Sequence, residues 1–159
     1  EIAAFLNAVS AGDISKDTSI KVKAMYKIIG ELESLGDSGE SISRILSRRN
    51  IHNKTFDQDT VKKLENMADA VENAYDVMIT NLMAAHKGQL VEISNAYNAE
   101  GRINNLRDYL RDAEIEAIES ERKNYQTSVY YMDILSELEK MGDFIINISQ
   151  NLEKVFVKR

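Results

Sequence analysis

Apolar residues recur at steps of three and four along almost the whole chain, and this spacing is the strongest constraint on how its 159 residues fold. Such a repeat gathers apolar side chains on one face of an α-helix, and that face is stable only when a neighbouring element covers it. Proline is absent and glycine occurs only 7 times, so strands joined by tight turns have little support. The sequence therefore predicts an all-α protein.

The periodic stretches predict one short helix and four long ones. Gly12-Asp13 is typical of a helix end, and Gly88 marks a second break. Thr55 and Gln58 fit a capping box at a helix start. No strong signal separates the last two helices, and the break between them is inferred from length alone. The expected helices cover residues 1–11, about 15–49, about 57–86, about 90–119 and about 124–157.

Short links between long helices favour antiparallel neighbours in a bundle. The length of the chain favours a single domain that covers residues 1–159. The methionines fall mostly on the apolar stripes, so we interpret them as core residues rather than as ligands of a soft metal. They are Met25, Met67, Met78, Met83, Met132 and Met141.

An acidic octapeptide occurs twice in the chain. The stretch at 31–38 reads ELESLGDS, and the stretch at 137–144, which lies 106 residues later, reads ELEKMGDF. When the comparison is extended to thirteen positions, seven are identical, which is more than two unrelated amphipathic helices would share. Glycine inside a helix costs about 1 kcal/mol relative to alanine. Gly36 and Gly142 therefore indicate that something approaches the backbone closely, and the chain is interpreted as duplicated around this acidic motif.

Each acidic motif carries two carboxylates four residues apart. Glu33 and Asp37 would lie one above the other on a helix face, as would Glu139 and Asp143. Like charges at this spacing repel by roughly 0.2–0.5 kcal/mol, and a shared cation would turn that repulsion into attraction. Oxygen ligands suit Mg²⁺, Ca²⁺, Mn²⁺ or ferric iron. The alternative is that both pairs are solvated helix flanks, since this spacing of acids is common in helices.

Other chemistry has little support in the sequence. A net charge of -6 argues against a nucleic-acid surface, and the absence of cysteine excludes disulfides and thiolate metal sites. His52 and His86 lie far apart and are interpreted as surface histidines. The Glu-x-x-His pair of di-iron bundles is also absent. We therefore expect no enzyme, and a di-metal carboxylate enzyme is kept as an alternative.

The two acidic motifs resemble the duplicated signature of the PhoU family, in which E(D)xxxD stands in a Leu-Glu-Arg-Ile-Gly-Asp context. The stretch EGRINNLR at 100–107 also resembles the acidic segment one helix earlier in that family's repeat. Together with YMDIL at 131–135, it makes the chain most similar to the PhoU-like cytoplasmic region of bacterial sodium/phosphate cotransporters.

This resemblance implies a PhoU-like antiparallel bundle of two three-helix pseudo-repeats that binds metal ions on its surface. Residues 1–50 would be the remnant of a first repeat and residues 57–159 the second. The chain begins without Met inside a helical pattern, so we expect it to be a piece of a longer protein. It departs from the family pattern at Ser34 and Lys140, which replace an arginine, and at Asn104, which replaces an acid. The implied metal ligands are Glu33, Asp37, Glu100, Glu139 and Asp143.

The resemblance implies a regulatory domain of a sodium-dependent phosphate cotransporter, at the cytoplasmic face of the inner membrane, with a role in phosphate transport and homeostasis. No apolar run approaches the roughly 18 residues that a membrane span needs. The implied partners are the membrane domain of the same transporter and, through an uncovered apolar stripe, a second copy in a homodimer. The alternatives are a free-standing PhoU-type regulator of phosphate uptake and a structural or oligomerising helical bundle without metal.

Overall fold

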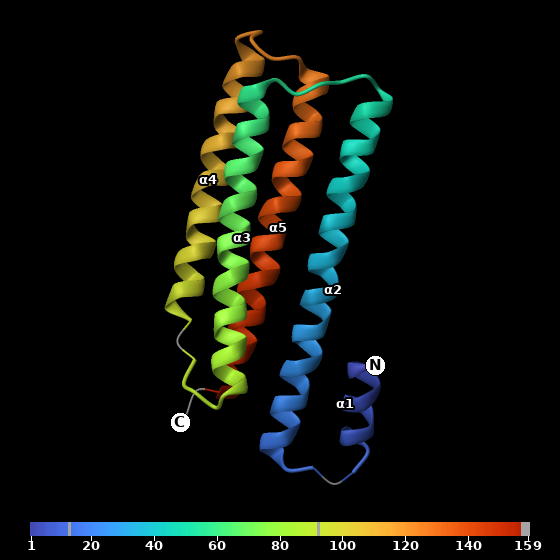
Figure 1. Ribbon diagram of the computed structural model, residues 1–159, viewed down its shortest axis with the longest axis vertical. Helices are drawn as coiled ribbons and strands as arrows, with labels where there is room; N and C mark the ends of the chain where they lie inside the picture. The colour runs from blue at the N-terminus through green and yellow to red at the C-terminus, as the bar shows by residue number, and fades with distance from the viewer. Residues whose placement is uncertain (13, 92, 157–159) are drawn as a thin grey trace.

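The computed structural model describes residues 1–12, 14–91 and 93–156, and every regular element within them is an α-helix. The helices are α1 (Ile2–Ser10), α2 (Lys16–Ile51), α3 (Gln58–His86), α4 (Ser94–Glu119) and α5 (Tyr125–Phe156). The predicted all-α class is confirmed, and the helices pack as a bundle (Figure 1). Asp13 and the predicted helix end at 157 lie outside the described residues. In this part of the chain, none of the helices combines the length and apolar character that crossing a membrane requires.

Helix α5 is the centre of the bundle. In the described parts of the chain it packs against α2, α3 and α4, whereas α4 packs against α3 and α5 only. Successive long helices run in opposite directions (Figure 1), as the short links predicted. Within the described residues, α2 packs against no helix other than α5 and the short α1, so one side of α2 is left open.

The apolar core is concentrated in α3, α4 and α5. Burying one large apolar side chain completely stabilises the fold by about 1.5–3 kcal/mol. The large apolar side chains with the least exposure are Met67 and Met78 in α3, Ile103 in α4, and Tyr131, Leu135 and Ile148 in α5. Helix α2 contributes few buried residues for its length, and most of them have small side chains. They are Val22, Ala24, Ser38 and Ile45.

The prediction that the methionines are core residues is only partly right. The structure places them in three environments: buried Met67 and Met78, half-buried Met132 and Met141, and exposed Met25 and Met83. The apolar stripe of α2 is wider than the surface that α5 covers, which leaves Met25 in solvent. Of the described helices, only α4 and α5 pack against α3, so its remaining face exposes Met83.

A side-chain cap sets the start of α3. Asp57 Oδ1 accepts a hydrogen bond from the backbone N–H of Thr60 over 2.7 Å. The capping box predicted at Thr55 and Gln58 is therefore wrong, because the Asp57 carboxylate already satisfies an open N–H of the first turn. The break inferred from length between the last two helices is confirmed, and it lies at 120–124.

Helix α4 begins at Ser94, four residues later than predicted. Gly88 adopts a φ of 68°, a conformation that glycine tolerates and that ends the preceding helix. Val91 and Ile93 lie outside the helices but are buried in the core. Their apolar spacing continues that of α4, and this is why the pattern alone placed the boundary too early.

Candidate functional site

The two acidic motifs lie at the same height on antiparallel neighbours. Asn147 Nδ2 on α5 donates a hydrogen bond to Glu31 Oε2 on α2 over 3.3 Å. The two helices run in opposite directions, so five residues forward from Glu31 and five residues back from Asn147 reach the same level. Those two positions are Gly36 and Gly142. The fold thus brings the duplicated stretches together across the pair formed by α2 and α5 (Figure 1).

The glycine of the second motif is a point of close helix packing. A Cβ atom at Gly142 would lie 2.9 Å from Ile103 Cδ1 and 3.2 Å from Ile103 Cγ2. Ile103 is fully buried, so it has little room to move away. Because residue 142 has no side chain, α4 can approach α5 closely at this point. This agrees with the prediction that a glycine, which is unfavourable inside a helix, marks a close approach to the backbone.

An ion pair joins the second motif to α4. Arg107 Nη2 lies 3.2 Å from Glu139 Oε1, and the two side chains are 26% and 21% exposed. The sequence interpretation did not include Arg107 among the site residues. A signal was available, because Arg107 follows Glu100 by seven residues, or two helical turns, and so shares its face of α4. The Glu139 carboxylate is thus already neutralised by a residue from the neighbouring helix.

Glu100 lies two turns from Arg107, toward the start of α4. Its Oε1 accepts a hydrogen bond from Asn104 Nδ2 over 3.1 Å, so the amide that replaces an expected acid holds Glu100 in place. Asp143, one turn after Glu139, is half-buried on α5. Glu100, Glu139 and Asp143 therefore come from two helices that pack against each other.

The first motif is open. Glu33 and Asp37 are both exposed, and within the described residues neither forms a hydrogen bond or an ion pair with another side chain. A Cβ atom at Gly36 would meet no atom within 4 Å. Among the residues that the structure describes, no element takes the place at the first motif that α4 takes at the second, because α2 packs against α5 and α1 alone.

The predicted metal ligands are only partly assembled. Carboxylate oxygens from Glu100, Glu139 and Asp143 have the right chemistry for a hard cation. In the parts of the chain that the structure describes, however, no three acidic or histidine side chains form a group that could hold a metal ion. The helix of Glu100 packs against the helix of the second motif, whereas Glu33 and Asp37 of the first motif are exposed. Metal binding stays a prediction.

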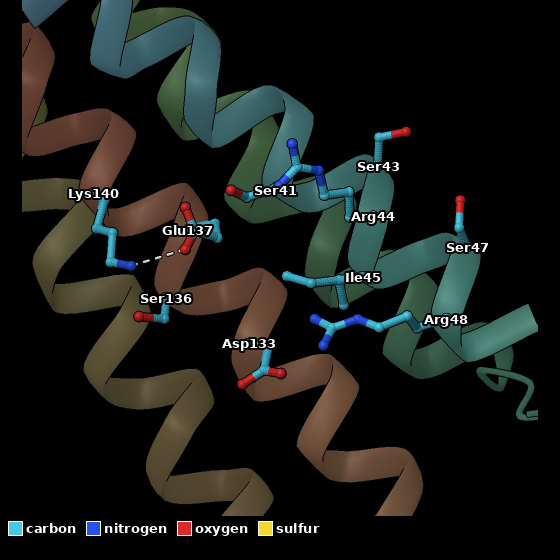
Figure 2. A pocket seen from close by; sticks show the side chains of 10 residues that line it. All are labelled: Ser41, Ser43, Arg44, Ile45, Ser47, Arg48, Asp133, Ser136, Glu137 and Lys140. Atoms are coloured by element: carbon cyan, nitrogen blue, oxygen red, sulfur yellow. Dashed lines mark hydrogen bonds and ion pairs between the residues drawn. The ribbon is translucent and has the colours of Figure 1, made fainter.

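A hollow of about 720 Å³ lies between α2 and α5 beside the start of the second motif. Figure 2 shows Arg48 of α2 reaching toward Asp133 of α5, while Lys140 Nζ donates to Glu137 Oε1 over 2.8 Å. That hydrogen bond raises the pKa of Lys140. The lining holds three basic and two acidic side chains, and serines supply the remaining polar groups.

The histidines are exposed, as predicted. His52, at the C-terminal cap of α2, also hydrogen-bonds through Nδ1 to the Tyr130 hydroxyl of α5. This contact ties the end of α2 to the central helix. His86 ends α3 on the surface. Neither histidine is placed to act on a nucleophile of an acidic motif.

In the described residues, the two copies of the acidic motif thus lie in two different environments. The second copy is packed against α4 and paired with Arg107, and the first is exposed. Each copy carries two carboxylates four residues apart, and in the second copy one of them forms an ion pair with Arg107. Comparisons of the chain with protein-family models, curated proteins and solved structures gave no match.

Proposed function

We propose that the chain is a non-enzymatic regulatory domain of the PhoU type, which belongs to a sodium-dependent phosphate cotransporter and takes part in phosphate transport and homeostasis. One observation carries the proposal. The duplicated acidic motifs lie at one height on the antiparallel helices α2 and α5. This is the arrangement expected of two repeats that face each other, so it supports the interpretation of 1–50 and 57–159 as repeats.

The regulatory element in this proposal is the contact between α4 and α5. Ile103 packs against Gly142, and Arg107 pairs with Glu139, so the position of α4 depends on the charge of the second motif. Glu139, Asp143 and Glu100 would hold a divalent or ferric ion, which would supply positive charge there. The open first motif offers α2 to the membrane domain of the transporter.

The test is phosphate uptake by cells that carry the full-length parent protein. The double variant Glu139→Gln/Asp143→Asn should change how uptake responds to the phosphate supply. The matched variant Glu33→Gln/Asp37→Asn controls for the loss of two acids. Uptake that equals wild type in the first variant, with the protein present at normal level, would contradict a regulatory role of the second motif. Long apolar spans upstream in the reading frame separate this proposal from a free-standing regulator.

A structural or oligomerising bundle is the second candidate. The pairing of Glu139 with Arg107 favours it, because that ion pair gives the acid a structural role without metal. The open side of α2 also exposes Met25 and Leu32, and exposed apolar residues on one face favour association. A homodimer through this face predicts that the sedimentation coefficient rises with concentration in wild type and not in Leu32→Glu. A monomer at all concentrations would contradict it.

A further inference from the structure

A second pocket, which we call the end pocket, is lined by residues of the link between α2 and α3, of the link between α4 and α5, and of the adjoining helices. Both links lie at the same end of the bundle (Figure 1). Its volume is about 270 Å³. The residues that border it include Asp57, Thr60, Glu114, Lys123 and Tyr131. It shares no residue with the acidic motifs, and the proposed function makes no use of it.

Glu114 is a buried carboxylate at this pocket. It is 2% exposed, and among the described residues it is the one charged side chain in the buried class. Its Oε1 accepts a hydrogen bond from the Ser128 hydroxyl. No lysine, arginine or histidine of the described chain forms an ion pair with it; the pairs nearest to the pocket join Lys123 to Asp57 and Arg122 to Glu116. Buried carboxylates ordinarily have a cationic partner, because an unpaired buried charge is costly.

Tyr131 borders the same pocket with an unused hydroxyl. The side chain is 0% exposed, and within the described residues its hydroxyl oxygen is buried without a hydrogen-bond partner. Burial raises the pKa of Tyr131, and the negative charge of Glu114 raises it further, so the hydroxyl stays neutral close to a carboxylate. Buried polar atoms nearly always have a partner in native proteins. The lone pairs of this oxygen are therefore available to a ligand.

The other charges at the pocket are already offset. Lys123 Nζ donates to Asp57 Oδ2 over 2.7 Å and to Thr60 Oγ1 over 2.6 Å. Arg122, at the rim, pairs with Glu116 over 3.1 Å. With Lys123 paired to Asp57 and Arg122 paired to Glu116, the Glu114 carboxylate is the one charged group at the pocket without an ion-pair partner among the described residues. A single excess charge matches a monovalent cation better than a divalent one.

We propose that the end pocket binds a small monovalent cation, either an alkali-metal ion or a protonated primary amine, through the Glu114 carboxylate and the Tyr131 hydroxyl. Both kinds of cation are satisfied by oxygen atoms, which these two side chains supply. The pocket is large enough for an alkali ion together with several waters, because each water occupies about 30 Å³ in the liquid. An alkali ion bound there would therefore keep part of its hydration shell. An amine would place its carbon atoms in the same space.

The first experiment is thermal unfolding of the 159-residue chain in four chloride salts at equal ionic strength. Potassium, sodium and methylammonium are the probes, and tetramethylammonium, which has no N–H and is too bulky to be coordinated, is the reference. At least one probe should raise the melting temperature by about 3 °C over the reference, because a ligand that binds only the folded state stabilises it. The probe that does so identifies the source of the cation. Equal melting temperatures in all four salts would overturn the proposal.

Variants then locate the effect. Glu114→Gln should abolish the difference between probe and reference salts, and Tyr131→Phe, which keeps the ring packing, should reduce it. Glu119→Gln removes an exposed acid that does not border the pocket and should keep the full difference. A full difference in Glu114→Gln would place the cation elsewhere and contradict the proposal. If Glu114→Gln does not fold, an undiminished difference in Tyr131→Phe is the contradicting result.

Discussion

The first and second acidic motifs share their sequence pattern but have different surroundings. At the second motif, α4 packs so closely that a Cβ atom on Gly142 would overlap Ile103, and Arg107 pairs with Glu139. At the first motif, Gly36 faces open space and both acids are exposed. The difference comes from the neighbouring helices: within the described structure, α5 packs against three long helices, whereas α2 packs against one. The shared sequence pattern therefore determines that both copies are helical. It does not determine whether the acids of either copy are exposed or packed against another helix.

The largest difference in stability between the two motifs is expected for substitutions of equivalent leucines. Leu138 is 7% exposed, and its counterpart Leu32 in the first motif is 41% exposed. Leu138→Ala should lower the free energy of unfolding by about 2–4 kcal/mol, because it removes buried methyl groups and leaves a cavity. Leu32→Ala should cost less than about 1 kcal/mol. Urea denaturation of both variants checks this, and equal losses would show that the two environments are alike.

The glycines provide an intermediate effect of opposite sign in the two motifs. Gly142→Leu should destabilise the protein by about 1–3 kcal/mol, because its side chain would have to displace the buried Ile103. Gly36→Leu meets nothing and should stabilise α2 by up to about 1 kcal/mol through helix propensity. The same denaturation measurements apply. A stable Gly142→Leu protein would contradict the close approach of α4 to α5.

The ion pair gives the smallest effect. In a double-mutant cycle of Arg107→Ala and Glu139→Ala, the coupling energy should be about 0.5–1 kcal/mol and should fall with added salt, since both groups are partly exposed. The same cycle between Arg107 and Glu33 is the matched control and should give no coupling. A coupling energy of zero in the first cycle would remove Arg107 from the site.

The sequence predicted the helices well because their signals are local. Spacing of apolar residues and the glycine at 88 located five helices in the right order. Two predicted helix starts were wrong. At α3 the capping residue is Asp57 and not Thr55. At α4 the buried Val91 continues the apolar spacing of the helix although it precedes the first helical residue. The exposure of Leu32 could not be predicted, because periodicity shows which face is apolar and not how many helices cover it.

The candidate site was predictable only as a set of acids. The repeated motif identified Glu139 and Asp143 as acids on one helix face. The ion pair of Glu139 with Arg107 could not be predicted, because it depends on the register between α4 and α5. The buried environment of Glu114 was missed for a related reason. Its neighbours Ser128 and Tyr131 follow in sequence only after a helix break, and a pattern of alternating charges gives no sign that one acid points inward.

We propose that the second acidic motif, against which α4 packs, is the copy that binds metal, whereas the first is an open surface. The most direct measurement is the metal content of the purified chain after exposure to Mg²⁺, Mn²⁺ and ferric iron, compared among three proteins. Wild type and Glu33→Ala/Asp37→Ala should retain bound metal, and Glu139→Ala/Asp143→Ala should lose it. Equal and negligible metal in all three would contradict the claim and favour the structural bundle.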